Sequence, residues 1–437
     1  MARLSSTRRA SGLSDLTIGS AASKSPLSAC CLETHSFASV FVTERRLPVV
    51  LALGTTQTVA WASSYYLPAI VAGPISADMG VSPVWVFAAF SASVLISGLV
   101  GPWVGRRIDT FGGRDVLAVS NVVFGAGLAL LAMAQTMTGV TIAWLVLGLG
   151  MGIGLYDAAF ATLGRLYGSS ARSTITGISL LAGFASTIGW PLSAWGVDAI
   201  GWRGTCFAWA AVHVLAALPL NLVFVPRIPA VLPVAGETAA PAVAKVAMDR
   251  NMWLLAVAFA GIWFVATAMG AHMPKLLEAA GATPVQAVAA AALMGPAQVA
   301  ARVLEAGFFS RYHPLVSARA ASMAHPFASV LLGFGGAAFA PVFALAHGGG
   351  NGILTIARGT VPLSIYGPQS YGYRLGLLGA PGRASQAFAP LLFSLALEHY
   401  GVYALALTGL LGLVTCAAFW LVVPVSPNET GAVSPAR

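Results

Sequence analysis

Residues 84–116, VWVFAAFSASVLISGLVGPWVGRRIDTFGGRDV, contain the pattern that decides the fold: a long apolar stretch followed by a short basic segment with glycines. A helix needs about 20 mainly apolar residues to cross the hydrocarbon core of a bilayer, and residues 84–105 meet this requirement. Eleven other stretches of similar length occur, so the sequence predicts an all-α membrane protein with twelve transmembrane helices. The expected helices are 47–70, 84–105, 116–135, 140–163, 173–196, 205–225, 253–273, 284–304, 316–336, 340–357, 375–397 and 402–423.

Basic residues alternate between the gaps that separate these stretches. Thirteen Lys and Arg residues lie in the gaps after the even-numbered stretches up to the tenth, and only Arg203 and Lys275 lie in the gaps after the odd-numbered ones. Cytoplasmic loops of membrane proteins carry an excess of Lys and Arg. We therefore expect a protein integral to the cell (inner) membrane, with both termini in the cytoplasm.

The composition excludes several functional classes. Charged residues make up 8% of the chain and hydrophobic residues 57%, whereas soluble domains average about 25% charged residues. The topology explains the net charge of +9, and the basic loops lack interleaved aromatics, so we expect no nucleic-acid partner. The expected partners are the lipid bilayer and a small-molecule substrate. Nucleotide-binding, hydrolase and metal-binding motifs are absent from the sequence, so we expect neither an enzyme nor a bound cofactor or metal.

The longest internal gap divides the chain into two groups of six stretches. Residues 226–252, rich in Ala, Val and Pro, are expected to be a flexible cytoplasmic linker between the halves 47–225 and 253–423. Two pseudo-repeated six-helix halves are typical of secondary transporters, whose substrate site lies near the midplane. Residues 1–46 are predicted to be a disordered basic cytoplasmic tail, with an organelle transit peptide as the alternative. Residues 424–437 form a second tail.

The segment after the second stretch resembles the cytoplasmic signature of the major facilitator superfamily, GxxxDxxGxR. Gly105, Asp109, Gly112 and Arg114 occupy its four defined positions. The resemblance implies the superfamily fold, alternating-access transport and a monomeric protein. In that family the glycines allow a tight turn. The acid and the arginine belong to a charge network that stabilises one of the two access states.

The eighth stretch is similar to one branch of that superfamily, the monocarboxylate porters and their relatives the oxalate–formate antiporters. Residues 295–302, GPAQVAAR, resemble the stretch in which the porters carry an Asp and, four residues later, an Arg. Arg302 matches the arginine, but Gln298 stands in place of the Asp. A neutral amide cannot take up a proton at physiological pH, so the resemblance does not support proton coupling of the porter type. The arginine usual in the fourth helix of drug–proton antiporters is also missing, since this chain has Trp144 there.

Asp157, within the fourth stretch, is the deepest carboxylate of the chain. An ionisable group at the bilayer centre costs at least about 2.5–3.5 kcal/mol. Asp157 is therefore interpreted either as a proton-coupling residue or as part of a structural ion pair with an arginine. Arg302 and Arg383 are expected to bind an anionic substrate, unless their side chains only extend to the interface. Two or three arginines with one aspartate would leave the cavity positive, which favours an anion.

The tenth stretch carries His347, Asn351, Thr355 and Arg358 at spacings of four, four and three, which place them on one helical face. We expect His347 and Asn351 to line the central cavity and, with Gln298, to donate or accept hydrogen bonds from the substrate. Arg358 is expected either to bind the substrate or to extend to the cytoplasmic interface.

The first stretch places Gln57 and Trp61 on a shared face, which we expect to line the same cavity. Trp263, in the seventh, is expected either to line it or to pack in the core. The sequence thus predicts secondary transport of a small organic anion such as a monocarboxylate. The alternative is proton-coupled efflux of a drug or metalloid through Asp157. A third hypothesis is a membrane sensor that does not transport.

Overall fold

The computed structural model describes residues 46–230 and 246–424, and within them every regular element is a helix. This confirms the predicted all-α class. The two predicted tails and most of the predicted linker lie outside the described residues.

The first half contains six helical segments, several of which are interrupted. In chain order they are α2 (Arg46–Ala60) with η1 (Trp61–Tyr65) and α3 (Pro68–Met79); α4 (Pro83–Phe111); α5 (Arg114–Met133); α6 (Met137–Gly154) with α7 (Tyr156–Tyr167); α8 (Arg172–Ala182) with the start of α9 (Ala185–Val212); and the rest of α9 with η3 (His213–Ala217) and α10 (Leu218–Phe224). The short η2 (Gly168–Ala171) joins the fourth segment to the fifth.

The second half repeats this number of segments. They are α11 (Arg250–Ala279); α12 (Pro284–Ala292) with α13 (Met294–Gly307); α14 (Pro314–Gly335); α15 (Ala340–Tyr366); α16 (Tyr371–Tyr400); and α17 (Leu405–Leu421). Three short turns, η4 (Phe309–Arg311), η5 (Gly336–Phe339) and η6 (Gly401–Ala404), connect them.

Glycines with positive φ explain how these elements make twelve crossings. Seven helical runs of the described residues are long and apolar enough to cross a membrane. The 88-residue run Met137–Phe224 would be about 130 Å long at 1.5 Å per residue, against a hydrocarbon core of about 30 Å. Such runs turn back at Gly168, Gly201, Gly336 and Gly401, where φ lies between 55° and 73°. With these turns, and with the interrupted segment 46–79, the chain has the twelve crossings that the sequence predicts.

The outer surface is apolar, as a lipid-facing surface must be. Phe334 is 92% exposed and Leu99 78% exposed, and many other large apolar side chains are also exposed. A monomeric soluble protein rarely exposes so much contiguous apolar surface. The helices therefore present this surface to the bilayer.

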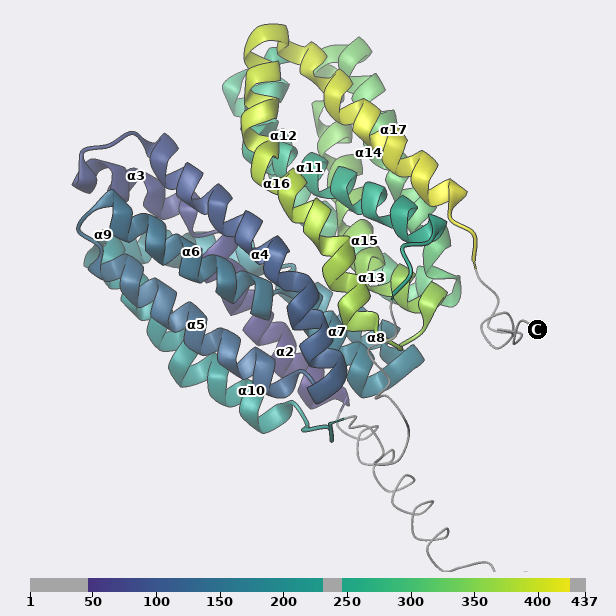
Figure 1. Ribbon diagram of the computed structural model, residues 1–437. Helices are drawn as coiled ribbons and strands as arrows, with labels where there is room; N and C mark the ends of the chain where they lie inside the picture. The colour runs from purple at the N-terminus through teal and green to yellow at the C-terminus, as the bar shows by residue number, and fades with distance from the viewer. Residues whose placement is uncertain (1–45, 231–245, 425–437) are drawn as a thin grey trace, which may run out of the picture. The chain divides into compact units, whose positions relative to one another are not determined.

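α16 packs along α4, which joins the second half to the first (Figure 1). Glycines allow this close approach. A Cβ at Gly98 would lie 2.8 Å from the Arg383 Cβ, and one at Gly376 would lie 2.5 Å from the Gly101 carbonyl oxygen. Further along, a Cβ at Gly105 would overlap the carbonyl oxygen of Gly372. These glycines (Gly98, Gly101 and Gly105 on α4, Gly372 and Gly376 on α16) form a glycine seam, which ends at the basic segment after α4.

Candidate functional site

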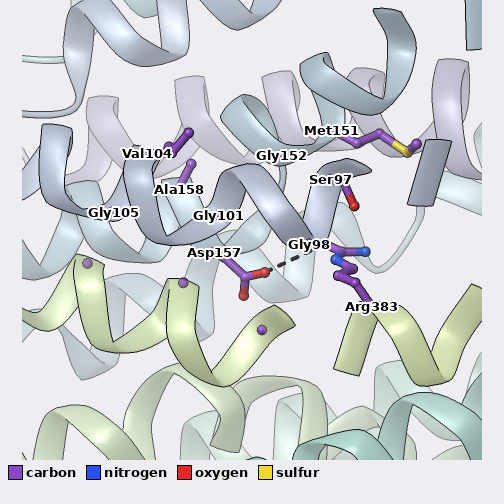
Figure 2. A pocket seen from close by; sticks show the side chains of 13 residues that line it. Ser97, Gly98, Gly101, Val104, Gly105, Met151, Gly152, Asp157, Ala158 and Arg383 are labelled. Atoms are coloured by element: carbon purple, nitrogen blue, oxygen red, sulfur yellow. Dashed lines mark ion pairs between the residues drawn. The ribbon is translucent and has the colours of Figure 1, made fainter. Parts of the chain in front are cut away.

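Asp157 forms an ion pair with two arginines from the other half of the chain. The fourth segment breaks at Leu155, whose backbone is extended, so Asp157 lies in the first turn of α7, where a carboxylate is favoured by the helix dipole. Its Oδ1 accepts a hydrogen bond from Arg358 Nη2 at 2.7 Å, and its Oδ2 lies 3.6 Å from Arg383 Nη2. Figure 2 shows Asp157 and Arg383 pointing toward each other beside Gly98.

Both arginines are buried, which decides whether the Arg358 side chain extends to the cytoplasmic interface. Their side chains are 5% exposed for Arg358 and 4% for Arg383. Arg358 therefore does not extend to the interface. Asp157 thus has two arginine partners, Arg358 on α15 and Arg383 on α16.

Asp157, Arg358 and Arg383 form a charged cluster, which two tryptophans cover. The guanidinium carbon of Arg358 lies 4.1 Å from the ring centroid of Trp263 on α11, and that of Arg383 lies 4.8 Å from it. Arg383 is also 5.8 Å from the ring of Trp61 on η1. Cations at such distances are attracted by the negative face of the ring. Trp263 thus joins Trp61 at the cluster.

Arg302, on α13, is buried with unused hydrogen-bond donors among the described residues. The residue is 4% exposed, and its Nε and Nη1 atoms make no hydrogen bond among the described residues. Its guanidinium lies against the backbone of Gly183, where a Cβ would overlap Nη1. It is also within electrostatic reach of the hydroxyls of Tyr66 and Tyr156. A buried charge without compensation is strongly unfavourable, so the site has unused capacity for an anion.

Other hydrogen-bond donors around the cluster are also unused. Arg383 Nη1 donates to Gln386 Oε1 at 3.0 Å, which leaves the buried Gln386 Nε2 without an acceptor. The indole N–H groups of Trp61 and Trp263 are likewise buried and unpartnered in the described part of the chain. Gln386 was not expected from the sequence, although its position three residues after Arg383 places it on the same helical face.

Gln57 bonds to the backbone just before Asp157, and Gln298 packs against α15. Gln57 Nε2 donates to the Gly154 carbonyl at 2.6 Å, so it stabilises the helix break that precedes Asp157. The backbone of Gln298 packs against α15, where a Cβ at Gly352 would lie 2.5 Å from the Gln298 carbonyl oxygen. Its half-buried side chain makes no hydrogen bond within the described ranges.

His347 and Asn351 are not brought to the charged cluster. His347 Nδ1 lies 3.1 Å from Nδ1 of His325 on α14, and His347, His325 and Asn351 line a separate pocket between α11, α14, α15 and α17. The expectation that they share a site with Arg358 is corrected by this packing. Helix α15 packs against α14 and against α7. His347 and Arg358 lie on one face of this helix by their spacing, but they contact different neighbouring helices.

The signature segment forms a contact between the halves at the end of α4. Asp109 lies in the last turn of α4 rather than in a loop, and its Oδ1 and Oδ2 accept the backbone N–H groups of Gly372 and Tyr373, each at 2.8 Å. These N–H groups belong to the first turn of α16, where they have no partner within the helix. The carboxylate also interacts favourably with the helix dipole.

Arg114 does not pair with Asp109. It donates to the Leu222 carbonyl near the end of α10, within the first half. The expected charge network between these two residues is therefore not formed. Gly112 has φ 83°, a conformation that favours glycine and ends α4.

Comparisons with known proteins agree with this architecture. The family model described as Major Facilitator Superfamily matches residues 53–346. The multidrug transporter protein MdtP of Bacillus subtilis (strain 168) is 30% identical over 129 residues, which are 29% of this chain and 24% of that protein. The chain thus matches about a quarter of that relative's length.

Solved structures share the fold over nearly the whole described chain. The human organic anion transporter MFSD10 (TETRAN) superposes with a TM-score of 0.68 and 16% identity, and covers 87% of this chain and 99% of its own. The E. coli fucose:proton symporter FucP superposes with a TM-score of 0.66 and 15% identity, and covers 87% of this chain and 100% of its own. At these identities the likeness concerns the fold alone.

Proposed function

Because this chain belongs to the Major Facilitator Superfamily, whose members transport small molecules across membranes, we propose that it transports a small organic anion, such as a monocarboxylate, by alternating access. Arg302, Arg383 and Arg358 bind the anion, and Asp157 holds two of them in place. The transporter is a monomer in the cell (inner) membrane, with both termini in the cytoplasm.

The observation that supports this proposal most is that Nε and Nη1 of the buried Arg302 have no hydrogen-bond partner within the described ranges. Arg358 and Arg383 share the single carboxylate of Asp157. The three arginines and the one aspartate leave the site with two excess positive charges. A guanidinium matches a carboxylate with two parallel hydrogen bonds. A small carboxylate would therefore satisfy the donors that the protein leaves unused.

The second candidate is efflux of a drug or metalloid driven by protons through Asp157. The aromatic side chains around the cluster and the partial similarity to a multidrug transporter favour it. The two arginines oppose it, because their guanidinium groups already occupy both carboxylate oxygens of Asp157. A sensor without transport is distinguished from both by the absence of substrate flux.

The first experiment is a thermal-stability screen of the purified protein in detergent. Monocarboxylates, dicarboxylates, oxyanions and cationic drugs are added separately, since a ligand that binds the native state raises Tm. We expect stabilisation by carboxylates alone. Stabilisation by cationic drugs alone would contradict the anion proposal and favour efflux.

Arg302→Lys then tests the assigned residue with the carboxylate that stabilises best. A lysine keeps the charge but not the two parallel donors, so we expect counterflow in proteoliposomes to fall about 10–100-fold, the loss of a charged hydrogen bond. Arg311→Lys, at an exposed position of the following turn, is the matched control. Unchanged KM and rate in Arg302→Lys would remove Arg302 from the binding site.

A further inference from the structure

Trp61 and Trp263 face each other across the two halves of the chain. Trp61 belongs to η1 in the first half and Trp263 to α11 in the second. Their rings are nearly parallel, with an interplanar angle of 19° and a centroid separation of 6.3 Å. This separation is near the long end of the 4.5–7 Å range of aromatic pairs.

A third flat ring would need the planes of the two indoles to move apart. Carbon atoms in contact lie about 3.5 Å apart, so a ring held between two indoles requires a distance of roughly 7 Å between their planes. The two indoles are on different halves, and alternating access moves these halves against each other. An opening of the site would thus create a slot for a planar group.

Several donors without a partner in the described chain lie in this part of the molecule. The indole Nε1 atoms of Trp61 and Trp263, Nε and Nη1 of Arg302 and Nε2 of Gln386 are all buried without a hydrogen-bond partner among the described residues. Arg383 connects the two indoles and Gln386, because it contacts all three. Arg302 lies within electrostatic reach of Tyr156, whose ring centroid is 5.1 Å from that of Trp61. A ligand that satisfies them must present several acceptor oxygens and negative charge.

Aromatic side chains surround the same region on the side of the first half. The Trp61 ring centroid lies 5.3 Å from that of Tyr65 and 5.1 Å from that of Tyr156. Tyr65 reaches the second half through a 3.3 Å hydrogen bond to Thr267. The walls of the slot are therefore flat and apolar, which suits a ring better than a short aliphatic acid.

Resting on the anion transport proposed above, we infer that the substrate is a planar aromatic carboxylate. Its ring lies between Trp61 and Trp263, and its carboxylate contacts Arg302 and Arg383 at the edge of the slot. This names the chemical class of the substrate and makes the two tryptophans its specificity determinants.

Three acids test this with the unmodified protein. Benzoate, cyclohexanecarboxylate and acetate carry the same charged group, but only benzoate has a flat ring. Binding to the full-length protein in detergent is measured by calorimetry at pH 7.5, where all three are ionised. We expect benzoate to bind about tenfold more tightly than cyclohexanecarboxylate, as one or two aromatic contacts would produce, and acetate to bind more weakly than both.

The outcomes separate the two proposals. Equal affinity for benzoate and cyclohexanecarboxylate would overturn the aromatic slot while leaving anion transport intact. Binding of none of these acids, together with no stabilisation by any other anion in the thermal screen, would overturn anion transport itself.

Variants locate the preference on the two indoles. In Trp61→Leu and Trp263→Leu, the ratio of benzoate to cyclohexanecarboxylate affinity is expected to fall toward one. Trp253→Leu, on the same helix as Trp263 but 60% exposed on the outer surface, is the control and should keep the ratio. Trp263→Phe retains a flat ring and should keep most of the preference. An unchanged ratio in both leucine variants would contradict the assignment.

Discussion

Among the contacts between the halves of this chain, two differ in how completely their polar groups are satisfied. At the end of α4, each carboxylate oxygen of Asp109 accepts one backbone N–H group of α16. Deeper in the molecule, Asp157 is shared by two arginines, and Arg302 nearby has no partner in the described chain. A satisfied contact can hold the halves together. A contact with unused donors is suited to bind a ligand.

Asp157→Asn should have the largest effect, because it removes the carboxylate that Arg358 and Arg383 share. Loss of one partner of a buried ion pair costs about 3–5 kcal/mol, so the free energy of unfolding should fall by about 3 kcal/mol. Added carboxylate should restore more of the lost Tm than it adds to the unmodified protein, since it replaces the missing charge.

Thermal unfolding with and without the carboxylate measures both effects. Asp198→Asn, at an exposed position, is the control. If Asp157→Asn were as stable as the control and responded equally to the anion, the arginines would not depend on this carboxylate.

Gly105→Leu should break the other contact by separating α4 from α16. Its side chain would overlap the backbone of Gly372, which cannot move like a flexible side chain, and overpacking typically costs about 1–3 kcal/mol. Ser97 lines the pocket in Figure 2. We expect a cysteine at this position to react faster in the Gly105→Leu variant than in the unmodified background when a thiol reagent is added on the side of the basic loops.

The labelling is done in a background without native cysteines. Gly270→Leu serves as the matched control, because nothing lies within 4 Å of a Cβ at that position. Equal labelling rates in the two variants would show that the glycine seam does not close this side.

Asp109→Asn sharpens the comparison with a smaller change. The amide still accepts a hydrogen bond from α16 but loses the charge that favours a helix N-terminus, an effect of about 0.3–1 kcal/mol. Labelling at position 97 should increase severalfold, less than in Gly105→Leu. Asp115→Asn, whose carboxylate is 66% exposed, should label like the unmodified protein, and an effect equal to that of Asp109→Asn would point to general surface charge.

His347→Gln should have the smallest effect, because His347 contacts His325 and not the charged cluster. Loss of one neutral hydrogen bond costs about 1 kcal/mol, so Tm should fall slightly while KM for the transported anion stays the same. A severalfold increase in KM, measured by counterflow, would return His347 to the substrate site.

The twelve crossings were predictable because their cause is local. Each crossing requires an apolar run of sufficient length, and the run 84–105 can be recognised without its neighbours. The signature of Asp109 and its glycines was also recognisable. Its partner was not, because the backbone N–H groups of Gly372 and Tyr373 carry no side-chain pattern.

The charged site was predictable only in part. Arg302, Arg383 and Asp157 were identified because ionisable residues are costly in the bilayer, and Trp61 was placed by its helical face. The same reasoning grouped His347 and Asn351 with Arg358 on one face of the tenth segment. It could not foresee that neighbouring helices separate them, with α14 beside His347 and α7 beside Arg358.

The sequence by itself determined that this chain crosses a membrane twelve times with its basic loops on one side, since the cost of transferring each segment depends on that segment alone. Only the tertiary structure decided which charges are paired. Asp157 and its partner Arg358 are 201 residues apart in the chain, and their pairing depends on how α7, α15 and α16 pack together. The same packing leaves two donor atoms of Arg302 without a partner in the described part of the chain, and that difference between satisfied and unsatisfied charge is what points to a function.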